Sequence, residues 1–246
     1  MTLGGSCMKV NRYSENSVTV YLGDDISEET NKKLVNLKKE LEDKALEGVT
    51  EIVISYTSLI IYFDVFKTSG KALEEVLQEI DLEALQGKSF EYRLVEIPVC
   101  YGGDYGPDLG RFEEDGLSPE EVIEMHSDTE YLVYMLGFMP GFPYLGGLDE
   151  KLFKARLDNP RTSIPAGSVG IGGKQTGMYP FTSPGGWNLL GRTPIPLFDE
   201  ERDPQILYEA GDRIVFKSID EAAYSKLEEE VAGGEYEVDI TMREAE

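Results

Sequence analysis

A group of basic residues is the strongest chemical signal in this chain of 246 residues. The chain carries 23 Lys+Arg against 47 Asp+Glu, a formal net charge of −24. Between residues 151 and 192, however, Asp158 is the one acidic residue among Lys151, Lys154, Arg156, Arg161, Lys174 and Arg192. A basic segment in an acidic protein can attract an anionic ligand. The alternative is that these side chains are solvated surface charges.

Arg161 and Arg192 are the arginines in the most rigid sequence contexts, Asn-Pro-Arg and Gly-Arg-Thr-Pro. A guanidinium group is a planar fork suited to a carboxylate or phosphate. Proline and glycine neighbours hold the backbone still and so lower the entropic cost of binding. We therefore expect Arg161 and Arg192 to be catalytic or ligand-holding residues, the alternative being two structural ion pairs.

His126 is the sole histidine and the only side chain whose unperturbed pKa lies near neutrality. It follows Val122 by four residues and Ile123 by three, so it shares their face of an expected helix. One interpretation is a general acid or base, or a residue that orients the substrate. The other is a hydrogen-bonded histidine at a helix C-terminus.

Neutral and aromatic residues complete the expected site. Gln175, Thr176 and Tyr179 would add hydrogen bonds on one wall, and Phe138 and Pro140 would contact the substrate. The other aromatic residues of this region, Phe142, Tyr144 and Trp187, are expected to shape the pocket or to lie in the core.

Several common sites are absent from the sequence. Gly87-Lys88-Ser89 lacks the earlier glycine of a phosphate-binding loop, and Gly170 and Gly172 lack the third glycine of a dinucleotide fingerprint. One histidine, with Cys7 and Cys100 far apart, predicts no metal site in this chain. Ser168 lies in an Ala-Gly-Ser-Val-Gly sequence close to a nucleophile elbow, but the glycines after it do not predict the required helix.

The elements that position these residues divide into two parts. Residues 1–90 alternate strand and helix patterns in the order ββαββα, with strands at 8–13, 17–22, 51–56 and 59–66. The helices begin near residues 27 and 71, and Gly48 is expected to end the first. Residues 91–246 are rich in strands and turns, beginning with a strand at 93–100 and ending with strands at 205–209, 212–217 and 235–241. Two helices interrupt this part, one capped by Ser118 and one at 221–229. The fold class is therefore α+β, with the composition changing near residues 87–91.

The charge also limits the partners. A net charge of −24 argues against nucleic acids and anionic membranes, which would repel the chain. Two cysteines without a paired spacing fit a reducing compartment, and no apolar run approaches the roughly 20 residues of a membrane span. With no recognisable signal peptide, we expect a cytoplasmic protein.

Long, non-repeating sequence words occur in order between residues 101 and 194. They include Gly-Phe-Met-Pro-Gly-Phe-Pro-Tyr-Leu (137–145), Pro-Ala-Gly-Ser-Val-Gly-Ile (165–171), Gln-Thr-Gly-Met-Tyr-Pro (175–180), Ser-Pro-Gly-Gly-Trp (183–187) and Gly-Arg-Thr-Pro (191–194). On these words the chain closely resembles the family of the 5-oxoprolinase B subunit. That family includes the sporulation kinase inhibitor Kip and was formerly labelled allophanate hydrolase subunit 1.

The resemblance implies a small α/β N-terminal domain followed by a cyclophilin-like β-barrel. It also implies a cytoplasmic prokaryotic subunit of an ATP-dependent amidohydrolase that opens 5-oxoproline to L-glutamate and is inactive alone. The implied partners are a second cyclophilin-like subunit and a metal-hydrolase-like subunit, and ATP would be bound by or shared with one of them. ATP is needed because the lactam is stable, and phosphorylation of its oxygen makes the carbonyl carbon a better electrophile for water.

Three alternatives stay open. The first is a module that binds a sensor histidine kinase and inhibits it. The second is an allophanate hydrolase subunit, although the sequence has no Ser-Ser-Lys amidase constellation. The third is a prolyl isomerase, which rests on fold analogy alone.

Overall fold

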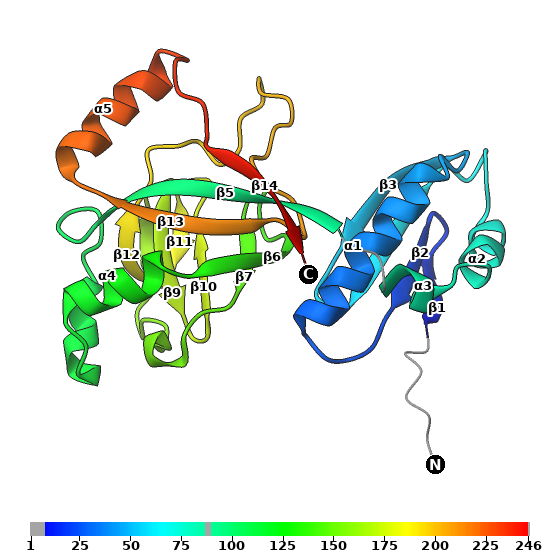
Figure 1. The fold of residues 1–246 in the computed structure, drawn as a ribbon, viewed down its shortest axis with the longest axis horizontal. Helices are drawn as coiled ribbons and strands as arrows, with labels where there is room; N and C mark the ends of the chain where they lie inside the picture. Colours follow the sequence, from blue (N-terminus) through cyan, green and yellow to red (C-terminus); the bar gives the residue numbers. More distant parts are fainter. Residues whose placement is uncertain (1–7, 87–89, 246) are drawn as a thin grey trace. The chain divides into compact units, whose positions relative to one another are not determined.

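The computed structural model describes residues 8–86 and 90–245 (Figure 1). The chain divides into two compact units, Met1–Phe90 with Glu244–Glu246, and Glu91–Arg243. Most of the predicted change of composition, at residues 87–89, lies outside the described residues. Each unit is described by itself.

The N-terminal unit is built on a four-stranded antiparallel sheet. Its strands are β1 (Lys9–Ser14), β2 (Ser17–Tyr21), β3 (Val49–Ile54) and β4 (Ser58–Phe63), in the spatial order β1-β2-β4-β3. Val18, Val20, Leu59 and Ile61 are fully buried, and their alternate positions place them on one face of the two central strands.

The helices of this unit are α1 (Glu28–Asp43), α2 (Gly70–Gln78) and α3 (Leu82–Gln86). Ser27 caps α1, since its side chain accepts a hydrogen bond from the Thr30 N–H at 3.2 Å. Gly48 was expected to end this helix, but the helix ends earlier, and Ala45 already has a positive φ of 46°. The ββαββα pattern is confirmed, while the short α3 was not predicted.

A closed β-barrel forms the second unit. Its eight-stranded sheet runs β12-β9-β10-β7-β6-β13-β5-β14, and an additional β12–β5 pairing joins seven of these strands into a ring. The ring strands are β5 (Phe90–Tyr101), β6 (Glu130–Leu136), β7 (Pro143–Gly146), β9 (Ser168–Gly172), β10 (Gln175–Met178), β12 (Asn188–Arg192) and β13 (Arg213–Ile219). The predicted fold class is confirmed.

Barrel closure depends on a close approach between β12 and β5. Gly191 lies opposite Tyr101, and a side-chain carbon at Gly191 would lie 2.6 Å from the Cys100 carbonyl oxygen. Glycine is therefore required at this point of the ring. The barrel interior is filled by β-branched and aromatic side chains, among them Val95, Ile97 and Phe216, all fully buried.

Outside the ring lie β14 (Ile240–Ala245), which pairs with β5, and a two-stranded ribbon of β8 (Arg161–Ile164) and β11 (Ser183–Gly185). The helices of the unit are η1 (Leu109–Asp115), α4 (Pro119–Ser127), η2 (Glu150–Leu152) and α5 (Glu221–Ala232). The predicted capping box at Ser118 is confirmed, because the Ser118 and Glu121 side chains each accept from the other's backbone N–H. None of the described helices is long and apolar enough to cross a membrane.

Two predicted strands are wrong. Residues 205–209 form no strand, and only Ile206 makes an isolated bridge, to Phe198. The Arg202 guanidinium donates to carbonyl oxygens of this region, including those of Pro204 and Gln205, and the Gln205 oxygen also accepts from the Asp199 N–H at 2.9 Å, so backbone pairing here is confined to the single bridge. The last strand begins at Ile240 rather than near residue 235.

Candidate functional site

A pocket of about 230 Å³ on the barrel unit gathers several of the predicted site residues. Its aromatic walls come from Phe138, Phe142, Tyr144, Tyr179 and Trp187. Arg156 and Gln175 supply polar groups, and the backbone of β11 and the residue after it, Pro184–Gly186, forms a further wall. We call this cavity the aromatic pocket.

Phe142 is the centre of the aromatic walls. Its ring contacts Tyr144, Tyr179 and Trp187 with centroid separations of 5.5, 5.6 and 5.6 Å, each edge to face. Edge-to-face pairs are a favourable arrangement of aromatic rings and are worth about 0.5–1.5 kcal/mol each beyond burial. The walls are therefore held by mutual contacts before any ligand binds.

The connection between β6 and β7 forms the rim of the pocket. Phe138 in this turn has a φ of 68° and a side chain 70% exposed, and its ring contacts Phe142 at 5.5 Å. A left-handed conformation is unfavourable for a bulky residue, and such strain is found most often at functional sites. A large apolar side chain is thus kept in water beside the pocket at an energetic cost.

The Tyr179 hydroxyl packs directly against Gly185 in the lining of the pocket. A side-chain carbon at Gly185 would lie 2.6 Å from the Tyr179 hydroxyl oxygen, so only glycine leaves the hydroxyl in place. Burial raises the pKa of Tyr179 to about 12, although the positive charges of Arg156 and Arg161 oppose the shift. The hydroxyl therefore stays protonated near neutral pH and can donate a hydrogen bond.

Arg156 is the cation of the aromatic pocket. Its side chain is exposed, and no residue in the described parts of the chain forms an ion pair or a hydrogen bond with it. The guanidinium donors are therefore available to an anionic ligand. Arg156 belongs to the basic segment between residues 151 and 192, but its sequence context did not distinguish it from the other cations there.

The Arg161 guanidinium is bound by other residues of the protein. It forms an ion pair with the buried carboxylate of Asp108 at 2.7 Å and donates to the Trp187 carbonyl oxygen at 3.3 Å. Asp108 also accepts from the Leu189 N–H at 2.7 Å, so the pair ties β8 to β12. This is the structural alternative stated for Arg161, which does not line the pocket.

His126 lies inside the barrel and is fully buried. Its Nδ1 is 2.8 Å from the Tyr101 hydroxyl, and its Nε2 is 2.8 Å from the Thr176 hydroxyl. Thr176 donates to the Gly170 carbonyl oxygen, so it accepts from Nε2–H, and Tyr101 donates to Nδ1. The ring also stacks on Phe216 at 4.7 Å. Burial lowers the pKa of His126 to about 3, so the ring is neutral and serves the core.

Arg192 lies apart from both the aromatic pocket and His126, against two tyrosine rings. Its guanidinium is over the Tyr105 ring at 4.8 Å from the centroid, with Tyr224 at 6.0 Å. Its Nε is buried without a hydrogen-bond partner among the described residues. Cation–π contact rather than an ion pair holds this arginine.

The structure therefore brings together Phe138, Gln175 and Tyr179 of the predicted site, with the pocket-shaping Phe142, Tyr144 and Trp187. It does not bring His126, Thr176 or Arg192 to this pocket, and Pro140 is exposed in the rim turn but does not line it. Gln175 lines the pocket and the adjacent Thr176 does not, because successive strand residues face opposite sides of the sheet. Within residues 8–86 and 90–245, no group of three or more His, Cys, Asp or Glu side chains is arranged to hold a metal ion.

Comparison with known proteins identifies the family. Residues 8–208 match the family described as "Carboxyltransferase domain, subdomain C and D". The 5-oxoprolinase B subunit of Bacillus subtilis (strain 168) is 39% identical over 233 residues, covering 90% of this chain and 97% of the relative. The chain belongs to the family of the 5-oxoprolinase B subunit. The corresponding 5-oxoprolinase protein of Haemophilus influenzae is 42% identical over 212 residues, or 85% of this chain and 97% of the relative.

Solved structures related to this family carry the same fold. The protein TTHA0988 matches with a TM-score of 0.74 at 35% identity, over 84% of this chain and 41% of that one. The chain thus spans about two fifths of TTHA0988. PH0987 from Pyrococcus horikoshii matches with a TM-score of 0.52 at 40% identity, over 88% of this chain and all of the other. The urea amidolyase of K. lactis, at 20% identity and a TM-score of 0.70, shares the fold.

Proposed function

We propose that this chain is a subunit of an ATP-dependent 5-oxoprolinase, opening 5-oxoproline to L-glutamate with partner subunits. The observation that carries the proposal is the match to relatives named as the 5-oxoprolinase B subunit, over 97% of their length in two cases. The aromatic pocket supplies the matching chemistry on this chain.

The size of the pocket fits a small substrate. Its volume of about 230 Å³ is below the roughly 300–1,000 Å³ usual for drug-sized ligands. The substrate is a five-membered lactam with one carboxylate. The faces and edges of Phe142 and Trp187 suit the flat ring, and the surrounding aromatic groups exclude water from it.

Arg156 would bind the substrate carboxylate. It is the pocket's one charged lining residue among those described, and it has no ion-pair partner there. Two parallel N–H donors match the two carboxylate oxygens, which fixes the substrate's orientation as well as its position. Arg161, neutralised by Asp108, would hold the wall without competing for the substrate.

Tyr179 would donate to the lactam oxygen. Its raised pKa keeps the proton on the hydroxyl, and Gly185 leaves room for that hydroxyl to reach the cavity. A donor at this oxygen would fix the orientation of the lactam carbonyl in the pocket. Gln175, on the same lining, would contact the polar edge of the ring.

ATP does not fit the aromatic pocket, which is small and has one cationic side chain among its lining residues. A nucleoside triphosphate carries several negative charges and requires more donors than this lining offers. We therefore assign ATP to a partner subunit, and assign no step at ATP to residues of this chain. The proposed partners are a second barrel subunit of the cyclophilin-like kind and a metal-hydrolase-like subunit, and the chain would be inactive alone.

A kinase-binding module is the second candidate. Phe138, 70% exposed and held in an unfavourable backbone conformation, is the feature that favours a protein ligand at the pocket rim. Autophosphorylation of a sensor histidine kinase, measured with and without the chain, tests this candidate. An allophanate hydrolase subunit is a lesser candidate, to which relatives named "Urea amidolyase" at 25–26% identity point.

Glutamate and ADP release from 5-oxoproline and ATP tests the first proposal, with the chain alone and with co-expressed partner subunits. We expect activity only in the mixture. Arg156→Ala should raise the KM for 5-oxoproline roughly 10- to 150-fold, since a charged hydrogen-bonded pair contributes roughly 1.5–3 kcal/mol. Arg213→Ala, on β13, is the matched control and should leave KM unchanged. Full affinity in Arg156→Ala would refute the role of the aromatic pocket.

A further inference from the structure

The barrel unit has a second, larger hollow that the proposed reaction does not use. Its volume is about 570 Å³, and its lining shares no residue with the aromatic pocket. The loop after β12 forms one side, and the segment between α5 and β14 forms the other (Figure 1). We call it the acidic groove. Its apolar lining consists of Ile195, Leu207, Val231, Tyr236, Val238 and Ile240.

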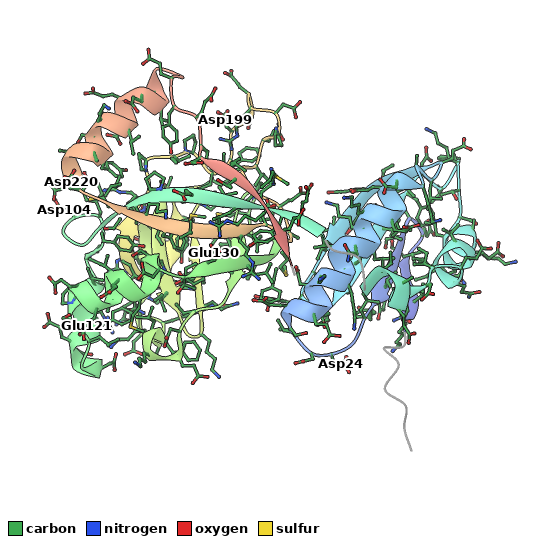
Figure 2. The ribbon with its side chains drawn as sticks, in the orientation of Figure 1. Asp24, Asp104, Glu121, Glu130, Asp199 and Asp220 are labelled. Carbon is green, nitrogen blue, oxygen red and sulfur yellow. The ribbon has the colours of Figure 1, made fainter. Side chains whose placement is uncertain are left out.

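One wall of the groove is held rigid by Arg202. The Arg202 guanidinium donates to the carbonyl oxygens of Pro196 at 3.0 Å, Leu197 at 3.2 Å and Gln205 at 2.9 Å. Asp199, labelled in Figure 2, accepts from the Glu201 N–H at 2.9 Å. The wall is therefore formed before a ligand binds, which lowers the entropic cost of binding.

The rim of the groove is negative. Asp199, Glu201, Asp203 and Glu237 line it, against Arg93 and Arg202. Both arginines already have partners within the protein: Arg93 forms an ion pair with the buried Asp212, and Arg202 donates hydrogen bonds to backbone oxygens. The pKa of Tyr236 is raised, first by burial and then by Asp239, Glu230 and Glu96, which extends the negative field beyond the lining itself.

The apolar lining and the negative rim together indicate which kind of ligand the acidic groove binds. An apolar floor beneath a carboxylate rim complements a chain in which Lys or Arg alternates with apolar side chains. Anionic ligands are repelled, and so is a second copy of this chain, with its net charge of −24. In the described structure, β14 is the last strand in the sheet order, so a segment lying past Ile240 can follow an open strand edge.

A protein neighbour is also consistent with the solved relatives. In TTHA0988 the matched part is 41% of a longer chain, so this fold occurs with further protein joined to it. We propose that the acidic groove binds an extended segment of a partner protein that carries alternating basic and apolar residues. This assignment is independent of the reaction proposed for the aromatic pocket.

Two synthetic peptides of alternating sequence, Leu-Lys and Leu-Glu, test the proposal on the full chain. We expect the Lys peptide to shift the methyl NMR signals of Leu207, Val238 and Ile240, and its affinity to fall with added salt. Asp203→Asn with Glu237→Gln should weaken binding about tenfold, since each exposed pair contributes modestly. Both side chains are exposed and lie at the rim, so the variant should fold.

The matched control removes the same charge elsewhere. Glu113→Gln with Glu120→Gln alters two exposed carboxylates outside the groove and should leave the affinity unchanged. Equal binding of both peptides, equal loss in both double variants, or shifts centred on Trp187 would overturn the proposal. The proposal would also be overturned if about 1 mM of the Lys peptide, a concentration that detects even weak binding, shifted none of these signals. It would be overturned as well if lysine amide bound as tightly as the peptide. Peptide binding is read without turnover, so its outcome is separate from the 5-oxoprolinase assay.

Discussion

Lowering the pH from 7 to 5 should destabilise the barrel through His126, the only histidine in the chain. In the folded protein the ring is buried and neutral, and its pKa is lowered to about 3 from the usual 6.5. The unfolded chain therefore binds a proton near pH 6.5 that the folded chain does not bind. The stabilisation is fully present above the unfolded pKa and is lost as the pH falls from 6.5 towards 3.

The magnitude follows from those two pKa values. One proton bound only by the unfolded state lowers the free energy of unfolding by about 2 kcal/mol between pH 7 and pH 5. Carboxylates also titrate in this range, so the comparison must be made with a variant lacking the histidine. His126→Gln keeps hydrogen-bonding groups at the site but does not titrate.

Urea unfolding of both proteins at intervals of pH measures this difference. His126→Gln should be less stable at pH 7 because two buried hydrogen bonds are disturbed. Its loss of stability on going to pH 5 should nevertheless be about 2 kcal/mol smaller than that of the unaltered chain. NMR of the His126 ring gives an independent check that needs no variant. Equal pH slopes, or a ring that titrates between pH 5 and 7 in the folded protein, would refute the burial argument.

Three further predictions concern the aromatic pocket and its supports. Phe138→Gly should be about 1 kcal/mol more stable to urea than Phe138→Ala, because glycine tolerates the φ of 68°; equal stability would contradict the strain. Arg161→Met should lower the free energy of unfolding by about 2–3 kcal/mol by leaving the Asp108 carboxylate buried without its cation, and adding Asp108→Asn should recover part of the loss in the same urea titration. Gly185→Ala should cost about 1–3 kcal/mol by displacing the Tyr179 hydroxyl, and thermal unfolding that matches the unaltered chain would show that the wall yields easily.

Local sequence signals predicted much of the fold. The Ser118 capping box marks the start of α4 correctly, because both partners lie within one turn of the chain. The strand predicted at residues 205–209 was wrong because this loop is organised by Arg202, whose guanidinium donates to several of its carbonyl oxygens, a side-chain contact that strand propensity does not describe.

The candidate site was predicted in part, and most of the failures come from contacts between residues that are distant in sequence. Arg161 meets Asp108, 53 residues away, whereas nothing in the described structure pairs with Arg156. Residue type and local rigidity favoured Arg161, but the decisive fact was a partner distant in sequence. His126 likewise depends on Thr176, 50 residues away. The prediction that Gln175 and Thr176 lie on the same wall was wrong. Adjacent residues of a strand point to opposite faces, and applying that rule would have separated them.

The ring closure through β5 also has a consequence during synthesis. β5 pairs with β12 and in parallel with β13, so both partners leave the ribosome long after β5 itself. From Tyr101 to Arg213 the ribosome adds more than a hundred residues, which at roughly 5–20 residues per second takes on the order of ten seconds. For that interval the strand edge of β5 that will pair with β13 is open, a target for chaperones and a risk for aggregation. A chain cut short before β13 would keep that edge open permanently.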